Sequence, residues 1–341
     1  MGPLSAFEGL LRNAGMSEPM DWNRIARAGF CRKLLKSAAV WRAAGLALTV
    51  MLLVAPVIPA AAEEVSHEHL GLQLRGNLVV APGKSLERDG VALVVHGTMA
   101  HHGMEIIRDL QANLQQRGIS TLAVTLSLGL DNRSGMYDCA LEHDHRHQDA
   151  VEEIAAWLAW LKEKGAGRVD LIGHSRGGAQ VALFAAGAPA EFSGRLVLAA
   201  PLLDNASPDQ TAARYEAQFG RPLMPLLEAA RKIEESDADE APLLEVPGFL
   251  NCRESRVSAA AFLDYYAGMR QPVAELLEQV KAPTLVVVAG ADELVPGVAD
   301  ALEVPGVATR KISVVDGADH FFRDLYGEDL ADAIATFLNR E

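Results

Sequence analysis

The stretch VDLIGHSRGG at residues 169–178 decides the fold. It begins with the mostly apolar run Val169–Ile172, which is typical of a buried strand, and leads directly into the pattern Gly-x-Ser-x-Gly. In this setting a serine sits on a strained turn between a strand and a helix, with its hydroxyl exposed. Gly173 and Gly177 are required because side chains there would collide with the neighbouring strand and helix. We therefore predict that Ser175 is a nucleophile; the alternative is a tight turn with a structural role only.

Strands and helices alternate on both sides of this stretch. From Leu78 onward, short β-branched runs alternate with longer amphipathic runs, which indicates a parallel sheet covered by helices. Leu70–Val80 is expected to add one or two antiparallel edge strands. The other predicted strands are Val91–Val95, Thr121–Thr125, Val169–Ile172, Leu196–Ala199, Leu285–Val288 and Lys311–Val315. The predicted helices are Gly103–Arg117, His147–Lys164, Arg176–Ala186, Pro272–Val280 and Leu325–Asn339. We expect a doubly wound α/β fold with a mostly parallel, eight-stranded sheet.

One insertion interrupts this rhythm. About 85 residues separate the strands that end at Ala199 and begin near Thr284, far more than a usual connection of about 2 to 6 residues. Residues 202–282 are therefore predicted to form a helical cap, with apolar helix-like runs at Ala212–Phe219, Leu223–Ile233 and Ser258–Met269. Tyr265 and Tyr266 in the cap fit either a lid over an acyl group or the core of a short helix.

Two residues downstream of Ser175 have the chemistry to activate it. A serine hydroxyl is a weak nucleophile, so it needs a base, and the base needs an orienting acid. Asp292 lies just past one predicted strand, and His320 lies on the loop that follows the next one. In open α/β sheets, residues that face a ligand gather at the carboxyl ends of the strands. We therefore predict a catalytic triad of Ser175, Asp292 and His320.

Other carboxylates compete for the role of the acid. Asp204 is the rival to Asp292 because it follows the preceding strand, Leu196–Ala199. Asp316 and Asp319 are too close to His320 in the sequence to be the first choice. Asp292 is preferred because it lies at the end of a strand and in the chain order Ser, Asp, His.

An oxyanion hole is predicted from two backbone amides. A tetrahedral intermediate needs hydrogen-bond donors for its developing negative charge. Arg176, the residue after the nucleophile, would supply one N–H group, and Thr98 would supply another from the loop His96-Gly97-Thr98. Gly97 permits close approach of the backbone. A simple turn between strand and helix is the alternative for this loop.

The N-terminal region has the layout of a targeting signal. Six basic residues between positions 24 and 42 precede the apolar run Ala43–Val57, and small residues follow up to Ala62. This predicts a signal peptide at residues 1–62, cleaved after Ala62, and export to the periplasm or beyond. The region before the apolar run is longer than usual, so a start at Met16 or Met20 and an uncleaved membrane anchor are alternatives.

The rest of the chain is acidic, with 24 basic against 42 acidic residues after position 62. This balance argues against nucleic acid or an anionic membrane surface as a partner, and favours a neutral or cationic small molecule. Membrane contact is expected only through the N-terminal segment, if it stays attached. Cys139 and Cys252 are a candidate disulfide in an exported protein, and two buried thiols are the alternative.

Histidines are concentrated in two further places. His143, His145 and His147 could indicate a metal, but Arg146 would repel a cation, so a solvated entrance to the helix at His147 is the preferred interpretation. His101 and His102 follow the predicted oxyanion loop and are expected near the start of the next helix, with no chemical role. We predict no metal site.

Four segments together resemble the α/β-hydrolase superfamily. They are LVVHGT at 93–98, GHSRGG at 173–178, GADELVP at 290–296 and GADHFF at 317–322, in the family's order. The resemblance covers Leu78–Asn339. It implies a serine hydrolase that works without a cofactor, with the triad and oxyanion amides named above.

The resemblance says less about the substrate, because this fold hosts many activities. We expect cleavage of a carboxylic ester through an acyl-enzyme intermediate, with a small-molecule ester or other acyl compound as substrate. A thioesterase, a peptidase or amidase on the same triad, and a non-catalytic periplasmic binding protein are the alternatives.

Overall fold

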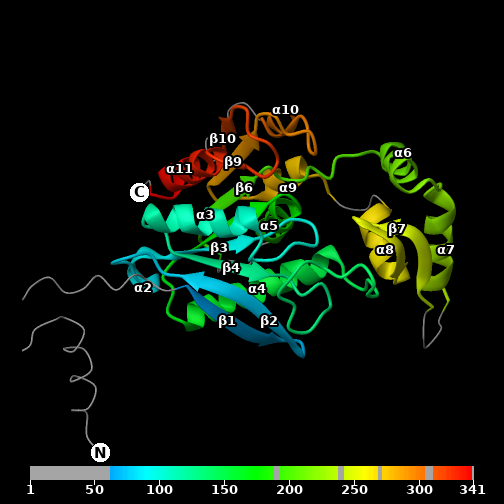
Figure 1. The fold of residues 1–341 in the computed structure, drawn as a ribbon, viewed down its shortest axis with the longest axis horizontal. Helices are drawn as coiled ribbons and strands as arrows, with labels where there is room; N and C mark the ends of the chain where they lie inside the picture. The colour runs from blue at the N-terminus through cyan, green and yellow to red at the C-terminus, as the bar shows by residue number, and fades with distance from the viewer. Residues whose placement is uncertain (1–61, 188–191, 237–241, 268–270, 304–309, 340–341) are drawn as a thin grey trace, which may run out of the picture. The chain divides into compact units, whose positions relative to one another are not determined.

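A computed structural model describes residues 62–187, 192–236, 242–267, 271–303 and 310–339 (Figure 1). These residues belong to the larger of two compact units of the chain, Ile58–Glu341. The predicted targeting segment falls outside the described residues, apart from Ala62. Across the ranges that are described, no helix has the length and the apolar character needed to cross a membrane.

The predicted sheet is confirmed: eight strands lie in the order β1-β2-β4-β3-β5-β6-β9-β10. β1 and β2 pair antiparallel, as do β2 and β4, and all other neighbours are parallel. The strands are β1 Glu63–His69, β2 Leu72–Val79, β3 Val91–Val95, β4 Thr121–Thr125, β5 Val169–His174, β6 Leu196–Ala199, β9 Thr284–Ala289 and β10 Arg310–Val315. The parallel strands bring their carboxyl ends to one edge, where loops can combine side chains from distant parts of the chain.

The antiparallel edge begins earlier than expected. Leu70–Val80 was predicted to hold one or two strands, whereas the structure has a hairpin whose first strand starts at Glu63 and whose turn passes through Leu70 and Gly71. In β1 only Val65 is buried, because one side of this edge strand faces solvent. A strand with a single buried apolar residue has no alternating pattern from which it could be predicted.

Helices occur where the amphipathic runs predicted them. Each of the five predicted helices is present, with ends within two residues of the expected ones: α3 Glu105–Gln116, α4 His147–Glu163, α5 Arg176–Ala186, α9 Val273–Gln279 and α11 Tyr326–Leu338. Two further helices, α2 Leu86–Asp89 and α10 Val298–Leu302, were not predicted. They are too short to show a helical period in the sequence.

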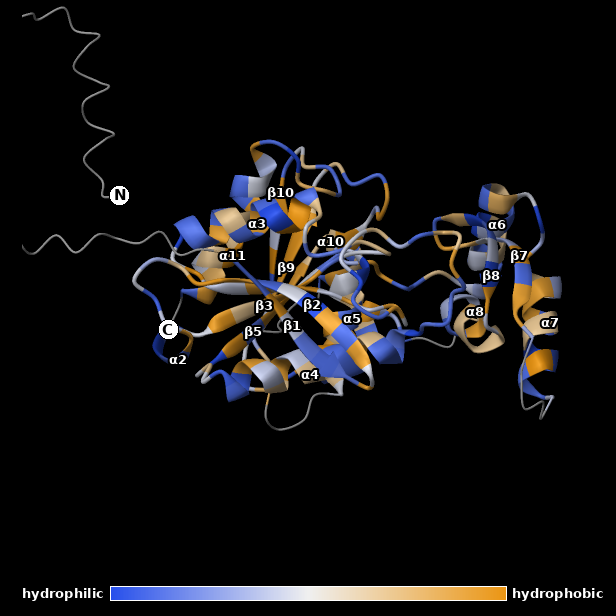
Figure 2. Cartoon of the chain, turned by 60° about the horizontal axis from the view of Figure 1, so that its bottom comes forward, coloured by the Kyte–Doolittle hydropathy of each residue, from blue (hydrophilic) through white to orange (hydrophobic). Residues whose placement is uncertain are grey.

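Apolar side chains cover both faces of the sheet. Along β3, Leu93 and Val95 pack in one hydrophobic cluster with residues of α4 and α5, whereas Ala92 and Val94 pack in a second cluster with residues of α3 and α11. This alternation follows from the period of two in a strand, and it buries every residue of β3. Figure 2 shows the hydrophobic colour of the central strands against the mixed surface of the helices.

The insertion folds as a cap that is only partly helical. Its helices are α6 Pro208–Phe219, α7 Met224–Glu234 and α8 Ala259–Tyr266, and it also holds the antiparallel hairpin β7 Leu244–Phe249 and β8 Cys252–Val257 (Figure 1). The three helical runs predicted for the cap are therefore present, and the hairpin is an element that the sequence did not predict. β7 contains Pro247 and Gly248, and β8 is mostly polar, so neither segment has the composition of a typical strand.

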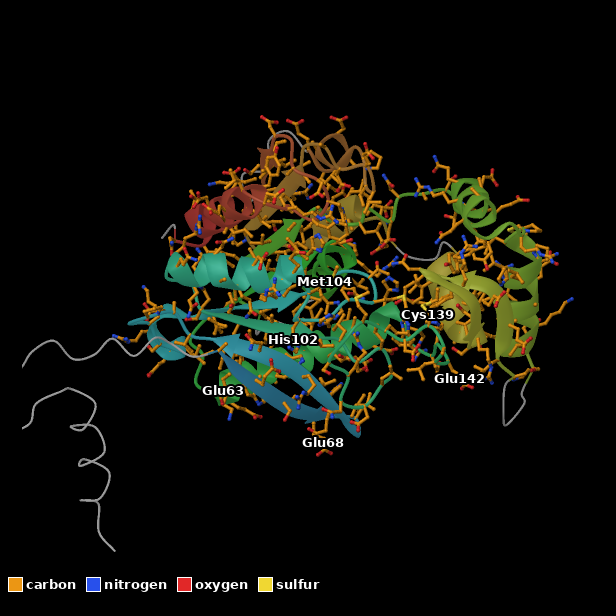
Figure 3. All side chains as sticks on the ribbon, viewed as in Figure 1. Glu63, Glu68, His102, Met104, Cys139 and Glu142 are labelled. Atoms are coloured by element: carbon orange, nitrogen blue, oxygen red, sulfur yellow. A yellow bond between two sulfur atoms is a disulfide. The ribbon has the colours of Figure 1, made fainter. Side chains whose placement is uncertain are left out.

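A disulfide ties this cap to the main sheet domain. Cys139, labelled in Figure 3, lies on the loop before α4 and is bonded to Cys252 at the start of β8. The bond joins residues 113 positions apart, with Cα atoms 5.3 Å from each other. The sequence left open whether these cysteines were bonded or free, and the structure has the bond.

Candidate active site

Ser175 occupies the turn between β5 and α5 in a conformation that few residues other than glycine adopt. Its φ is 55° and its ψ is −120°. The turn is possible because its glycines lack side chains: a Cβ at Gly173 would collide with the backbone of Gly177, and a Cβ at Gly177 would collide with the carbonyl oxygens of Val95 and His96. The strained turn directs the serine side chain away from the helix and toward the loops at the strand ends.

His320 and Asp292 lie in hydrogen-bond contact with each other and with this serine. Nε2 of His320 is 2.8 Å from Oγ of Ser175, and Nδ1 of His320 is 2.7 Å from Oδ2 of Asp292. The other carboxylate oxygen of Asp292 accepts hydrogen bonds from the backbone N–H groups of Leu294 and Val295, each at 2.9 Å. One oxygen of the carboxylate is therefore held by the backbone of its own turn, while the other oxygen orients the imidazole of His320.

The competing carboxylates lie elsewhere. Asp204 is at the wall of a cleft after β6 and has no contact with His320. Asp319 accepts a hydrogen bond from Arg323 Nη1 at 2.8 Å, and Asp316 is exposed on the same loop. Of the acids considered from the sequence, Asp292 alone is in contact with the imidazole of His320.

The loop His96-Gly97-Thr98 packs directly against the nucleophile. A Cβ at Gly97 would lie 3.1 Å from Cβ of Ser175, so the backbone approaches Ser175 as closely as a glycine allows. In the described part of the chain, the backbone N–H of Thr98 donates to no acceptor. Arg176 begins α5, and N–H groups in the first turn of a helix have no partner within the helix. Both predicted oxyanion amides are thus free to bind an anionic oxygen beside Ser175.

His96 fixes the shape of this loop. Its Nδ1 donates to the carbonyl oxygen of Gly97 at 2.8 Å, and its Nε2 accepts the backbone N–H of Leu126 at 3.0 Å. Burial, together with the charge of Arg133 nearby, lowers the pKa of His96 well below its usual value. The imidazole is therefore neutral, with its proton on Nδ1, as both hydrogen bonds require.

His174 supports the triad, although the sequence analysis gave it no role. Its Nε2 donates to the backbone carbonyl of His320 at 2.9 Å, and the two rings lie 5.0 Å apart. Burial lowers the pKa of His174 to about 4, so the ring stays neutral and keeps this donor. The residue is the first variable position of the Gly-x-Ser-x-Gly pattern, which says nothing about its contact with a loop 146 residues away.

A buried polar network holds the segment next to the oxyanion loop. Arg133 donates to the carbonyl oxygens of Leu126 and Ala100, each at 2.8 Å. Glu153, on α4, accepts hydrogen bonds from the backbone and the hydroxyl of Ser127. Burial raises the pKa of Glu153 to about 7. No local pattern in the sequence marked these residues, because their partners come from different elements.

A cleft of about 310 Å³ lies on the side of the cap, next to Arg176, the residue that follows Ser175 in the chain. Its walls combine the two oxyanion residues, Thr98 and Arg176, with residues of α6, α8 and the loops after β6 and β9. Tyr265 and Tyr266 of the cap both line it, and both also pack in the hydrophobic core of the cap, so the two alternatives for these residues stay open. The cleft is the space available for a substrate bound near Ser175.

The histidine cluster before α4 is buried, which corrects the prediction of a solvated helix entrance. His143, His145 and His147 are 0%, 1% and 3% exposed. The cap covers them: His143 stacks on Tyr137 at 4.6 Å and packs against Phe249 of β7 at 4.9 Å. Within the described residues, no group of three or more His, Cys, Asp or Glu side chains is arranged to hold a metal ion.

His101 and His102 precede α3, as expected. His102 is 8% exposed and hydrogen-bonds through Nδ1 to Oγ1 of Thr125 at 2.7 Å. Its Nε2 lies 3.3 Å from a carboxylate oxygen of Glu64 on the edge strand. These contacts connect the loop before α3 to strands β4 and β1.

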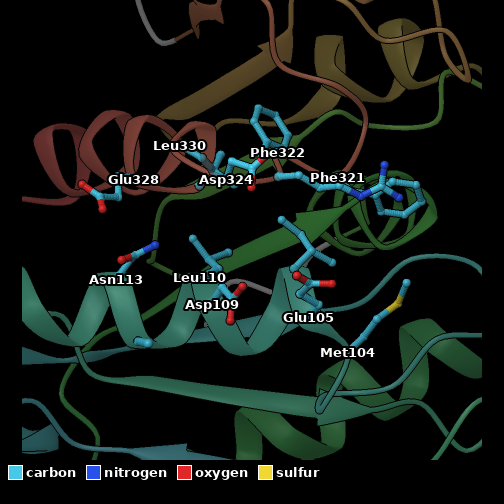
Figure 4. A pocket seen from close by; sticks show the side chains of 14 residues that line it. Met104, Glu105, Asp109, Leu110, Asn113, Phe321, Phe322, Asp324, Glu328 and Leu330 are labelled. Carbon is cyan, nitrogen blue, oxygen red and sulfur yellow. The ribbon is translucent and has the colours of Figure 1, made fainter.

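A second cavity, of about 290 Å³, lies between α3 and the segment that leads into α11 (Figure 4). Acidic side chains line it, namely Glu105, Asp109, Asp324 and Glu328, together with apolar ones such as Leu110 and Phe322. Unlike the cleft next to Arg176, it is lined by neither of the two predicted oxyanion residues, Thr98 and Arg176. Its chemistry differs from that of the cleft beside Ser175, and nothing in the structure marks it as a ligand site.

The chain matches a known protein family but no curated protein sequence. A profile of the Alpha/beta hydrolase family matches residues 92–333, more than half of the chain. Comparison with curated protein sequences gave no match.

Solved structures of similar fold come from a Penicillium, a Butyrivibrio and a Pyrococcus source and share 17 to 20% of their residues with this chain. GrgF, an alpha/beta hydrolase from Penicillium sp. sh18, has a TM-score of 0.58 at 20% identity, over 82% of this chain and 98% of that one. Est1E from Butyrivibrio proteoclasticus has a TM-score of 0.53 at 20% identity, over 81% and 97%. The esterase Pf2001 from Pyrococcus furiosus has a TM-score of 0.52 at 17% identity, over 82% and 90%. At these identities the likeness establishes the fold.

Proposed function

Because the chain belongs to the α/β-hydrolase family, we propose that it hydrolyses carboxylic esters through an acyl-enzyme intermediate formed on Ser175. The observation that carries the proposal is the continuous hydrogen-bond path from Asp292 through His320 to Ser175, at 2.7 and 2.8 Å. Both distances lie in the range for proton transfer between a nucleophile and its base. A non-catalytic binding protein with this fold would not require both hydrogen bonds, from Asp292 to His320 and from His320 to Ser175.

The first half of the reaction forms the acyl-enzyme. Oγ of Ser175 attacks the carbonyl carbon of the ester while Nε2 of His320 takes the hydroxyl proton. The negative charge on the carbonyl oxygen is stabilised by the backbone N–H groups of Thr98 and Arg176. Asp292 stabilises the imidazolium. Collapse of the tetrahedral intermediate breaks the bond to the alcohol oxygen, which receives the proton from His320.

The second half releases the acid. A water molecule gives a proton to Nε2 of His320 and attacks the acyl carbon, and the same two amides stabilise the second tetrahedral intermediate. Ser175 then leaves as the alkoxide and recovers the proton from the imidazolium. Every proton passes through one ring nitrogen, and Nδ1 stays bonded to Asp292. All of these steps use groups that the chain itself supplies.

Active-site labelling tests the role of the serine. The purified protein is treated with a fluorophosphonate probe, and turnover of p-nitrophenyl esters of short and long acyl chains is measured alongside. We expect labelling and turnover in the wild type and the loss of both in Ser175→Ala. An unlabelled wild-type protein with no turnover above background contradicts the proposal and favours a binding protein, whereas labelling with turnover of thioesters or amides alone would move the proposal to those substrates.

We further propose that the protein is exported. The disulfide between Cys139 and Cys252 supports this, because such bonds persist in oxidising compartments and are rare in the cytosol. The acidic balance of the chain after residue 62 supports a small-molecule substrate rather than nucleic acid. Fractionation of cells that express the full chain tests the location: the protein is expected outside the cytoplasm, and recovery of soluble, reduced protein from the cytoplasm alone contradicts it.

A further inference from the structure

The side chain of Arg176 lies in the cleft beside the nucleophile and is held by neutral partners. Its Nε donates to Oγ1 of Thr98 at 3.0 Å, and its Nη1 donates to Nε2 of His147 at 3.1 Å. The guanidinium also lies 5.1 Å from the ring centre of Tyr265, on cap helix α8. Three elements therefore fix the position of the guanidinium, although none of these contacts neutralises its charge.

The partner histidine is oriented by a carboxylate that is already engaged. Nδ1 of His147 donates to Oδ2 of Asp264 at 2.7 Å, and the backbone N–H of His147 donates to the same oxygen at 2.9 Å. The proton of the neutral ring is thus on Nδ1, which leaves the lone pair of Nε2 to accept from Arg176. Asp264 acts on Arg176 only through His147. No described carboxylate forms an ion pair with Arg176, although Asp264 and nine other described acids do form ion pairs elsewhere.

The charges that line the cleft are more positive than the rest of the molecule, so the neutral or cationic compound expected from the overall charge of the chain is not what this site favours. Arg176 and Arg214 line it together with one carboxylate, Asp204, in a chain whose formal net charge is −14. Arg214 lies on α6 and is exposed, whereas Arg176 is half-buried. A half-buried guanidinium without an acidic partner favours an anion from outside, and its planar N–H groups match the two oxygens of a carboxylate.

We propose that the substrate is an ester that also carries a carboxylate, and that the side chain of Arg176 binds this carboxylate. The inference rests on the proposed esterase function and names the substrate class for the same site. Arg176 directly follows Ser175, so its guanidinium lies within about one arginine side chain of the reacting carbonyl. The cleft of about 310 Å³ therefore suits the half-ester of a short dicarboxylic acid. Arg176 contributes its amide to the oxyanion hole and its guanidinium to specificity.

The test compares two substrates that differ only in charge. Release of methanol is measured from monomethyl glutarate and from methyl 4-carbamoylbutanoate, in which a neutral amide replaces the carboxylate. We expect the wild type to prefer the charged ester by about ten- to a hundredfold in kcat/KM. In Arg176→Gln the ratio of the two kcat/KM values should fall to near one, and Arg176→Lys should keep part of it. Because the ratio is taken within each variant, any effect of the substitution on the chemical step cancels.

The matched control is a variant that loses one positive charge at a position outside the cleft. Arg88→Gln removes an exposed arginine that pairs with Asp89 on α2, and it should leave the ratio as in the wild type. A second measurement does not depend on folding of the variants: glutarate should inhibit hydrolysis of p-nitrophenyl acetate by the wild type competitively, and at least tenfold more strongly than glutaramide.

The outcomes separate this inference from the function on which it rests. Equal turnover of both methyl esters, equal inhibition by glutarate and glutaramide, or an unchanged ratio in Arg176→Gln overturns carboxylate recognition while the esterase function stands. No turnover of any ester, with no fluorophosphonate labelling, overturns the esterase function itself.

Discussion

Two buried histidines in different regions of this molecule, His320 and His143, are bonded in opposite ways. At the corner of the sheet that holds Ser175, both ring nitrogens of His320 have partners, Asp292 and Ser175. At the junction between cap and sheet domain, neither ring nitrogen of His143 has a hydrogen-bond partner among the described residues. The first imidazole is placed for proton transfer. The second serves as a flat ring in an aromatic cluster with Tyr137 and Phe249.

This difference separates residues that act through charge from residues that act through packing. A buried polar group without a partner costs stability, and the aromatic contacts and the disulfide at the junction act against this cost. Replacement of a side chain beside Ser175 should therefore remove activity. Replacement of a side chain between the cap and the sheet domain should change the free energy of unfolding.

Replacement of Asp292 by asparagine should have the largest effect. The amide cannot stabilise the imidazolium and can hold His320 in the wrong tautomer, so kcat should fall by about 10³ to 10⁴-fold with little change in melting temperature. Steady-state kinetics on p-nitrophenyl acetate measures the fall. Asp316→Asn, an exposed carboxylate on the loop of His320, is the control and should lose less than about twofold. A similar loss in Asp204→Asn, with activity kept in Asp292→Asn, would give the role of the acid to Asp204.

Removal of the disulfide should have an intermediate effect, on stability. The double variant Cys139→Ser/Cys252→Ser should unfold with a free energy about 2 to 4 kcal/mol lower, because the bond restricts an unfolded loop of 113 residues. Urea denaturation with and without reductant measures this. Reductant should destabilise the wild type and leave the double variant unchanged; a wild type that is insensitive to reductant would show that the bond contributes nothing.

Replacement of His143 by phenylalanine should have the smallest effect at neutral pH and a larger one in acid. The new ring keeps the stacking on Tyr137 and removes two buried nitrogens, so the free energy of unfolding at pH 7 should stay within about 1 kcal/mol of the wild type or rise. Urea denaturation at pH 7 and pH 5 measures both values. His69→Phe, a change of the same kind on the edge strand β1, is the control and should not alter the response of the cap junction to acid.

The acid response follows from the direction of the pKa shift. Burial lowers the pKa of His143 from 6.5 to about 4, so between these values the unfolded chain binds a proton that the folded chain does not. Stability from this residue is present above about pH 6.5 and is lost as the pH falls toward 4. The wild type should lose about 1 to 2 kcal/mol more than His143→Phe between pH 7 and pH 5, the lower figure allowing for solvent screening. Parallel losses in the two proteins would place the acid sensitivity elsewhere.

Local patterns were enough to predict the sheet and the contact of the three distant side chains. Val169–Ile172 is apolar throughout except at Asp170. The sequence predicted that side chains at Gly173 and Gly177 would collide with their neighbours, and the structure confirms both collisions. Ser175, Asp292 and His320 each follow a strand, and parallel strands bring such positions to one edge of the sheet. The order of the strands in space then places the three side chains within hydrogen-bond distance. Their catalytic roles remain predictions until the labelling experiment is done.

Contacts between distant segments were not predictable in the same way. His143 precedes a helix and is polar, so the sequence favoured a solvated position, and only the hairpin β7–β8 of the cap buries it. The hairpin was not predicted because β7 contains Pro247 and β8 is rich in charged residues, and neither feature is typical of a strand. His174 and Arg133 have partners that depend on how loops from different elements meet. Such partners are a property of the assembled fold and not of a local pattern.

The backbone of Ser175 has a consequence for engineering. A non-glycine residue at a φ of 55° and a ψ of −120° costs on the order of 1 to 3 kcal/mol, which the rest of the fold must absorb. Glycine at this position would relax the turn and remove the nucleophile in the same step. A variant with glycine at position 175 is therefore expected to be more stable than the wild type and inactive. Selection for thermal stability alone would favour the loss of Ser175 and of its activity.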